Sequence, residues 1–143
     1  MKIVKFPDLI LLTPSLDVEL NQEVLDFIDE MEEFFLTGLK WGVPAGLAAP
    51  QVGKNWNIFI ALGEVYINPE IVKKSKGGKY DREGCYSLED GIFYDVWRSD
   101  SLTLKWTTKD GGKRKKHIFG FPARVIQHEF DHLQGELCNQ KSK

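Results

Sequence analysis

The chain contains few cysteines and histidines, no long apolar run and no strong excess of charge. Two cysteines, Cys85 and Cys138, occur in 143 residues; in a cytosolic chain such a pair is more often a source of a ligand or nucleophile than a structural disulfide. No apolar run approaches the roughly 20 residues needed to span a bilayer. The formal net charge of -2 provides no field that would attract nucleic acid or an anionic membrane. We therefore expect a cytoplasmic protein with no membrane partner and no direct nucleic-acid partner.

The size and composition are those of one ordinary globular domain. The chain has a mass of 16.4 kDa, with 42% hydrophobic and 28% charged residues, which is enough to build a hydrophobic core. No internal repeat, low-complexity tract or long linker divides it. We expect a single domain over residues 1–143.

A long amphipathic helix is predicted near the start of the chain. Asn21 can cap it, and it is expected to run from Gln22 to Lys40, before Gly42 and Pro44. Its apolar residues recur at helical spacing: Val24, Phe27, Ile28, Met31, Phe34, Phe35 and Leu39.

The middle of the chain favours β structure, and the end favours a second helix. The expected strands are Trp56–Leu62, Val65–Ile67 (ending at Asn68-Pro69), Tyr94–Trp97, Leu102–Thr107 and, after a hairpin turn at Asp110-Gly111-Gly112, Lys115–Phe119. The cluster Lys113–Lys116 is interpreted as a solvated flank of that hairpin rather than an anion site. A helix is expected over Pro122–Leu133, ending before Gly135. The predicted class is α+β, with a helix against a mixed or antiparallel sheet.

The strongest chemical motif is His128-Glu129-Phe130-Asp131-His132. Residues four apart lie one above the other on a helix, so both imidazoles can reach a single metal ion. Glu129 lies about 100° around the helix from His128, where a carboxylate can take a proton from water and later return it to a leaving nitrogen.

A catalytic metal site usually has three protein ligands, so a third ligand is expected. The candidates are the acidic residues, His117 and the two cysteines. Cys138 is interpreted as a small apolar residue that packs the chain end. Cys85 follows Gly84, which allows close approach of the backbone, but a lone cysteine is more often a buried hydrophobe.

A third segment, Ala45–Gly53, is rich in small residues. Such a segment can lie beside a site without filling it, and the Gln51 amide could stabilise a developing oxyanion. By itself, the segment is better explained as a tight turn with an incidental glutamine.

Taken together and in this order, the three segments resemble the motifs of the peptide deformylase family. Those motifs are Gly-x-Gly-x-Ala-Ala-x-Gln, Glu-Gly-Cys-x-Ser and His-Glu-x-x-His. The corresponding segments here are Pro44–Gln51, Glu83–Ser87 and His128–His132. The resemblance implies the deformylase fold, in which a sheet packs around a central metal-binding helix, and hydrolysis of the formyl group from N-terminal formylmethionine of newly made peptides.

The resemblance also assigns roles to residues. It implies one divalent metal held by Cys85, His128 and His132, with iron(II) as the physiological ion and zinc, nickel or cobalt accepted. Catalysis would use Glu129, the Gln51 side chain and the Tyr86 backbone N–H. The peptide would lie extended beside Ala45 and Gly46, and the methionine pocket would involve Phe121, Arg124 and Val125.

Two positions depart from the family pattern. Pro44 replaces the first glycine and removes a backbone donor. Arg124 stands where the resemblance suggests an apolar residue; we expect its guanidinium to point outward with only the stem packed, with a rim position that selects the residue after methionine as the alternative. Glu83 and Arg98 are a candidate ion pair that braces the cysteine loop.

The sequence also resembles the short deformylases encoded by phages. Only eleven residues follow His132, so the C-terminal helix through which longer members contact the ribosome is not expected, and ribosome contact by another route stays open. Two other functions stay open: a zinc endopeptidase built on the same helix, and a deformylase-like protein that binds peptides or metal without turnover.

Overall fold

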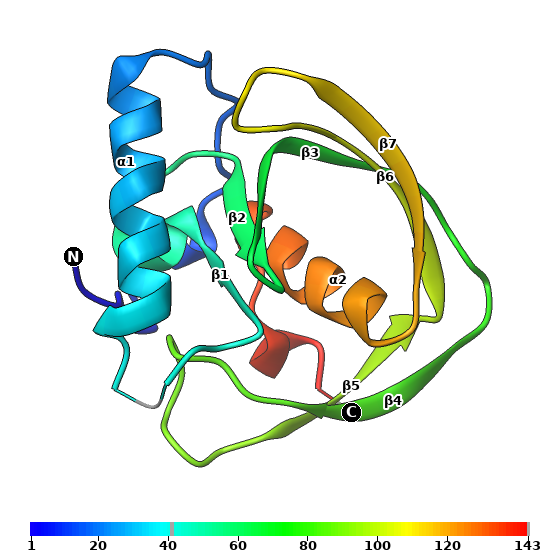
Figure 1. The fold of residues 1–143 in the computed structure, drawn as a ribbon. Helices are drawn as coiled ribbons and strands as arrows, with labels where there is room; N and C mark the ends of the chain where they lie inside the picture. The colour runs from blue at the N-terminus through cyan, green and yellow to red at the C-terminus, as the bar shows by residue number, and fades with distance from the viewer. Residues whose placement is uncertain (41, 143) are drawn as a thin grey trace.

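A curved antiparallel sheet wraps around one helix in the computed structural model, which describes residues 1–40 and 42–142. Figure 1 shows helix α2 (Phe121–Leu133) in the hollow of this sheet. The five strands, in spatial order, are β1 (Gly46–Ala48), β2 (Ile58–Ala61), β3 (Glu64–Lys74), β6 (Ser101–Thr107) and β7 (Lys113–Phe119). The predicted α+β class with an antiparallel sheet around a helix is confirmed.

Strands β4 (Gly78–Glu83) and β5 (Tyr94–Ser99) pair only with each other, in a second, two-stranded sheet. Helix α1 (Gln22–Glu33) lies on the outer side of β1 and β2. Short 3-10 turns occur at Leu9–Leu12, Ala49–Val52 and Cys138–Gln140. No helix within the described ranges is long and apolar enough to cross a membrane.

Alternating side chains of the central strands build two separate cores. In β2, Ile58 and Ile60 join the cluster that contains the apolar face of α1. Phe59 and Ala61 point the other way, into the cluster that contains α2. This period-2 alternation places the sheet between the two helices and holds α2 on a rigid support.

Helix α1 begins at the predicted residue but ends earlier than predicted. Asn21 accepts a hydrogen bond from the Val24 N–H at 3.0 Å, which confirms the cap. The α-helix ends at Glu33, and a π-helical turn follows over Phe34–Gly38. The Phe34 ring occupies the space that a Cβ on Gly38 would need, so this glycine permits the wider turn.

Asn68-Pro69 does not end a strand as predicted, because β3 continues through it to Lys74. The register shifts between Ile67 and Glu70, and Asn68 adopts a left-handed φ of 49°. A β-bulge absorbs the proline, which has no N–H for the ladder. Strand β1 is too short, and strand β4 too polar, to be predicted from a hydrophobic pattern in the sequence.

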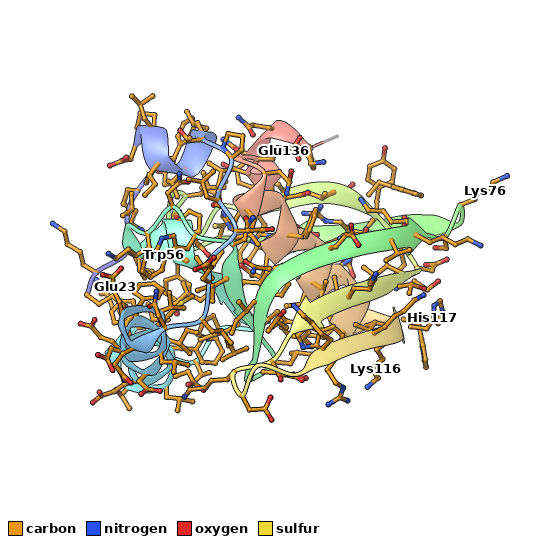
Figure 2. The ribbon with its side chains drawn as sticks, turned by 90° about the horizontal axis from the view of Figure 1, so that it is seen from above. Glu23, Trp56, Lys76, Lys116, His117 and Glu136 are labelled. Carbon is orange, nitrogen blue, oxygen red and sulfur yellow. The ribbon has the colours of Figure 1, made fainter. Side chains whose placement is uncertain are left out.

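The basic cluster Lys113–Lys116 lies on β7, an edge strand of the five-stranded sheet, and its side chains are exposed. Figure 2 shows Lys116 and His117 at the periphery, on the side away from α1. The hairpin turn before them is present, with Gly111 at φ 90°. These lysines are a solvated flank, as predicted, and His117 lies on the same strand.

Candidate metal centre and peptide cleft

Helix α2 and the loop after β4 bring three potential metal ligands together. One ligand atom each from Cys85, His128 and His132 lies within 4.8 Å of the other two. The Cys85 Sγ is 3.4 Å from the His132 Nε2, and the two imidazole centroids are 5.1 Å apart. The histidines converge because they are four residues apart on a buried helix, and β4 delivers the cysteine from the opposite side.

Glu83, the last residue of β4, fixes the orientation of the first histidine. Its Oε1 lies 2.8 Å from the His128 Nδ1. The predicted pair with Arg98 is present and bidentate, with both nitrogen–oxygen distances at 2.9 Å. Although burial opposes ionisation, hydrogen bonds from Arg98 and His128 hold the pKa of Glu83 well below its usual value. An ionised Glu83 leaves the His128 Nε2 directed at the ligand cluster.

The pKa values of the two histidines shift in opposite directions. Burial opposes protonation of His128, but hydrogen bonds to Cys85 and Glu83 raise its pKa well above the usual value. For His132, burial and the neighbouring His128 both lower the pKa, which favours the neutral imidazole. A neutral imidazole is the form that binds metal.

Glu129 is buried beside the ligand cluster and against strand β1. Burial raises its pKa to about 7, and its buried Oε1 has no hydrogen-bond partner among the described residues. A Cβ added to Gly46 would lie 2.5 Å from the Glu129 Oε2. The absence of a side chain at Gly46 therefore makes room for the carboxylate.

The Gln51 amide is held in one orientation. Its Oε1 accepts a hydrogen bond from the Ala48 N–H at 3.0 Å. Its Nε2 then lies 3.2 Å from the Ser87 Oγ and 3.4 Å from the Cys85 Sγ. The amide donors thus face the ligand cluster, as an oxyanion stabiliser requires.

These residues line a cleft of about 740 Å³. Its walls contain ten of the residues predicted from the sequence: Ala45, Gly46, Gln51, Cys85, Tyr86, Phe121, Arg124, Val125, His128 and Glu129. His132 is only 1% exposed and lies behind the surface. Arg82 and the segment Glu89–Phe93 also line the cleft and were not predicted from the sequence. A turn at Gly91 followed by two apolar residues, Ile92 and Phe93, both exposed in the structure, could have indicated a loop that borders a site.

Tyr86 and Pro44 shape the approach to the cleft. The Tyr86 hydroxyl donates to the Gly42 carbonyl at 3.0 Å and so joins the cysteine loop to the segment that precedes β1. Pro44 lies at the cleft wall. The family glycine is therefore replaced at the approach to the cleft, and Gly46 and Gln51 beside the ligands are unaffected.

The expectation that Arg124 points outward is wrong. The residue is 8% exposed, and its Nη1 donates to the Glu83 Oε2 at 2.6 Å. Further hydrogen bonds run to the carbonyls of Val96 and Lys79. The buried Glu83 carboxylate attracts the guanidinium more strongly than solvent does, because an unpaired buried charge is costly.

A second cluster of possible ligand atoms comprises Glu83, His128 and Cys138. The carboxylate in it is already engaged by Arg98, Arg124 and His128. Cys138 is 2% exposed in an apolar cluster, and burial raises its pKa to about 11, which disfavours a thiolate ligand. Cys138 packs the chain end, as expected.

The set of Cys85, His128 and His132 suits a borderline transition metal. One thiolate and two imidazoles are ligands for zinc, iron, nickel or cobalt, and hard ions such as calcium or magnesium prefer oxygen. Three ligands on one side of a cleft leave a position open for substrate or water. The residues present therefore fit a catalytic metal.

The sequence model of the polypeptide deformylase family matches residues 1–143. The chain belongs to the polypeptide deformylase family. The peptide deformylase of Dictyoglomus thermophilum is 37% identical over 140 residues, which cover 95% of this chain and 88% of the relative. That of Pseudothermotoga lettingae is 42% identical over 95 residues, which cover 64% of this chain and 55% of the relative.

The fold agrees with this assignment. The crystal structure of a probable peptide deformylase from Synechococcus phage S-SSM7 superposes with a TM-score of 0.88 at 33% identity, over 99% of each chain. Deformylases are metalloenzymes that remove the formyl group from the amino termini of nascent peptides, and this hydrolysis is the activity of the chain.

Proposed function

We propose that residues 1–143 form one catalytic domain that hydrolyses the formyl group of N-formylmethionyl peptides at Cys85, His128 and His132, with Glu129 as the proton-transfer group. One observation carries the assignment of residues: the three ligand atoms converge within 4.8 Å in a cleft whose walls also contain Gly46 and Glu129. The metal proposed for the cell is iron(II), with zinc, nickel or cobalt accepted, because the ligand set suits all four and the resemblance to deformylases favours iron.

The peptide is proposed to bind as an added strand. Strand β1 is at one end of the five-stranded sheet, so one of its edges is unpaired in that sheet. Ala45 and Gly46 line the cleft, and their backbone groups can pair with an extended peptide. The methionine side chain would then enter the cleft between Phe121 and Val125.

The chemistry follows from the residues around the ligands. When bound, the divalent ion supplies Lewis acidity, which makes hydroxide accessible near neutral pH and polarises a carbonyl. Glu129, whose pKa is about 7, can take a proton from the attacking water and return it to the departing amine at neutral pH. The Gln51 amide and the Tyr86 N–H stabilise the oxyanion that forms at the formyl carbon.

Formate release from formyl-Met-Ala-Ser by metal-loaded protein tests this proposal. We expect Glu129→Gln to retain metal and lose at least about 100-fold in kcat, because general acid–base catalysis contributes about that much. We expect Cys85→Ser to reduce both metal content and activity. Metal content that is unchanged in Cys85→Ser would show that the ligand set is wrong.

The same preparation separates the two alternatives. Cleavage of an internal peptide bond without formate release would support a zinc endopeptidase. Peptide binding without formate release by anaerobically handled, fully loaded protein would support a binding protein without turnover. Metal analysis of protein isolated without oxygen identifies the native ion.

A further inference from the structure

Arg124 connects the wall of the cleft to the residues that surround the metal ligands. It lies on α2, four residues before His128, and lines the cleft. Its guanidinium donates to the Glu83 Oε2 at 2.6 Å, to the Lys79 carbonyl at 2.8 Å and to the Val96 carbonyl at 3.1 Å. One side chain therefore bonds α2 to both strands of the two-stranded sheet.

This connection matters because the two-stranded sheet delivers Cys85. Strands β4 and β5 hydrogen-bond to each other and not to the five-stranded sheet. The position of the cysteine loop relative to α2 therefore depends on side-chain contacts between the two. Besides Arg124, the buried Arg98 provides such a contact by bridging Glu83 and Asp131. Gln127 of α2 provides another, because its amide accepts from the Ser99 N–H and donates to the Ser99 carbonyl on β5.

The Glu83 carboxylate has a full set of hydrogen-bond partners. Its Oε1 accepts from Arg98 and faces the His128 Nδ1, and its Oε2 accepts from Arg98 and Arg124. A carboxylate offers about four lone-pair sites, so the group cannot turn without breaking a bond. Removal of the Arg124 fork frees one site on Oε2 and releases two backbone carbonyls.

Charge balance adds to this geometric effect. Two buried guanidiniums, Arg98 and Arg124, face two buried carboxylates, Glu83 and Asp131. Lys141 also lies 3.7 Å from the Asp131 carboxylate. Without Arg124, Glu83 keeps only one of its two guanidinium partners, Arg98. The attraction that holds β4 against α2 is then weaker, so β4 can move away from α2 together with the Cys85 loop.

We propose that Arg124 is a positioning residue: it fixes the distance between the Cys85 loop and the two-histidine helix and so sets how firmly the metal is held. The proposal rests on the metal site under "Proposed function". It assigns to Arg124 neither contact with the metal nor selection of the peptide sequence.

The test compares Arg124→Met and Arg124→Lys with wild type. Methionine keeps an unbranched stem at the cleft wall and removes every donor. Lysine keeps the charge but not the planar fork that reaches three acceptors. Arg114→Met is the matched control, because Arg114 lies on the exposed strand β7 over Trp106 and outside this cluster.

Two measurements report on the metal without turnover. The first is the rate at which zinc passes to an excess of chelator. The second is the thiolate-to-metal charge-transfer absorption of cobalt-loaded protein, which reports on the Cys85 bond. We expect metal loss about 10- to 100-fold faster in Arg124→Met, as is typical for residues that orient ligands, with a weakened thiolate band. Arg124→Lys should be intermediate, and Arg114→Met should match wild type.

Other outcomes would overturn the proposal. Wild-type metal retention and an unchanged thiolate band in Arg124→Met would show that the other contacts, those of Arg98, Gln127 and Gln51, position the loop without Arg124. If the metal-free forms of both variants are unfolded by circular dichroism, Arg124 is a general structural residue. A protein with firmly held metal and no formate release contradicts the proposed function and leaves this inference intact.

Discussion

The buried carboxyl of Glu129 destabilises the fold when it is ionised, and ionisation is what its proposed role in proton transfer needs. Its ordinary pKa of 4.5 rises to about 7 in the fold because the carboxyl is buried. A raised acid pKa means that the folded state prefers the neutral form. Stability is then fully present below pH 4.5 and is lost as the pH rises through 7. Above pH 7, the carboxyl proposed for proton transfer is therefore ionised at a cost to the stability of the fold.

We therefore predict that Glu129→Gln stabilises the metal-free protein at pH 8 but not at pH 4. The gain is on the order of 3 kcal/mol, since one pKa unit corresponds to about 1.4 kcal/mol. Urea unfolding at the two pH values measures it. A stability difference between variant and wild type that is the same at both pH values would contradict the assignment of the raised pKa.

Residue-level prediction from the sequence was successful where spacing fixes geometry. His128 and His132 share one face of α2 because they are four apart, and Asn21 caps α1 as its side chain predicts. The direction of Arg124 was not predictable, because it depends on Glu83, which is 41 residues away in the chain. Long-range burial of a charge leaves no local pattern.

At the scale of elements, the contact between β1 and α2 decides where the catalytic carboxylate lies. Gly46 has no side chain, and the Glu129 carboxylate fills the space beside it. Strand β1 and helix α2 therefore approach each other at this point more closely than they could if position 46 carried a side chain.

We predict that Gly46→Ala lowers kcat for formyl-Met-Ala-Ser by at least about 100-fold, because the new Cβ displaces the proton-transfer group. Metal content should be unchanged, since the atoms nearest to the new Cβ all belong to Glu129 and none to a proposed ligand. Gly77→Ala is the control: Gly77 lies in the turn between β3 and β4, away from the cleft. Full activity in Gly46→Ala would show that Glu129 can work from another position.

The elements themselves were predictable where apolar periodicity was strong. Helix α1 and strand β6 stand out because their buried residues repeat regularly, whereas α2 was predicted from Pro122 at its start and Gly135 after its end. Strand β4, Gly78–Glu83, has exposed residues along most of its length and owes its structure to β5. Strand β3 continues past Pro69 only because its partner β6 tolerates a bulge.

At the scale of the molecule, a bound metal is expected to stabilise the folded state. The proposed ligands come from α2 and from the loop after β4, so an ion bound there would link two units that share no backbone ladder. A ligand that binds only the folded state stabilises that state by mass action.

We predict that metal at about 100 times its dissociation constant stabilises the protein by about 2.7 kcal/mol and raises Tm by roughly 10 °C. Differential scanning calorimetry of chelated and reloaded protein measures the shift. Cys85→Ser should show a clearly smaller shift at the same metal concentration. An equal Tm with and without metal would mean that the ion does not join the two units.

The two edges of the five-stranded sheet have opposite consequences for self-association. Strand β7 carries four consecutive basic residues, Lys113–Lys116, and such charges repel a second chain that could pair there and start aggregation. Strand β1 must stay accessible if a peptide is to bind, so charge cannot protect it in the same way. It is only three residues long, and Pro44 before it offers no N–H. A peptide that binds there as proposed needs only a few backbone hydrogen bonds, whereas a long strand of another protein would find too few partners on β1 to start a fibre.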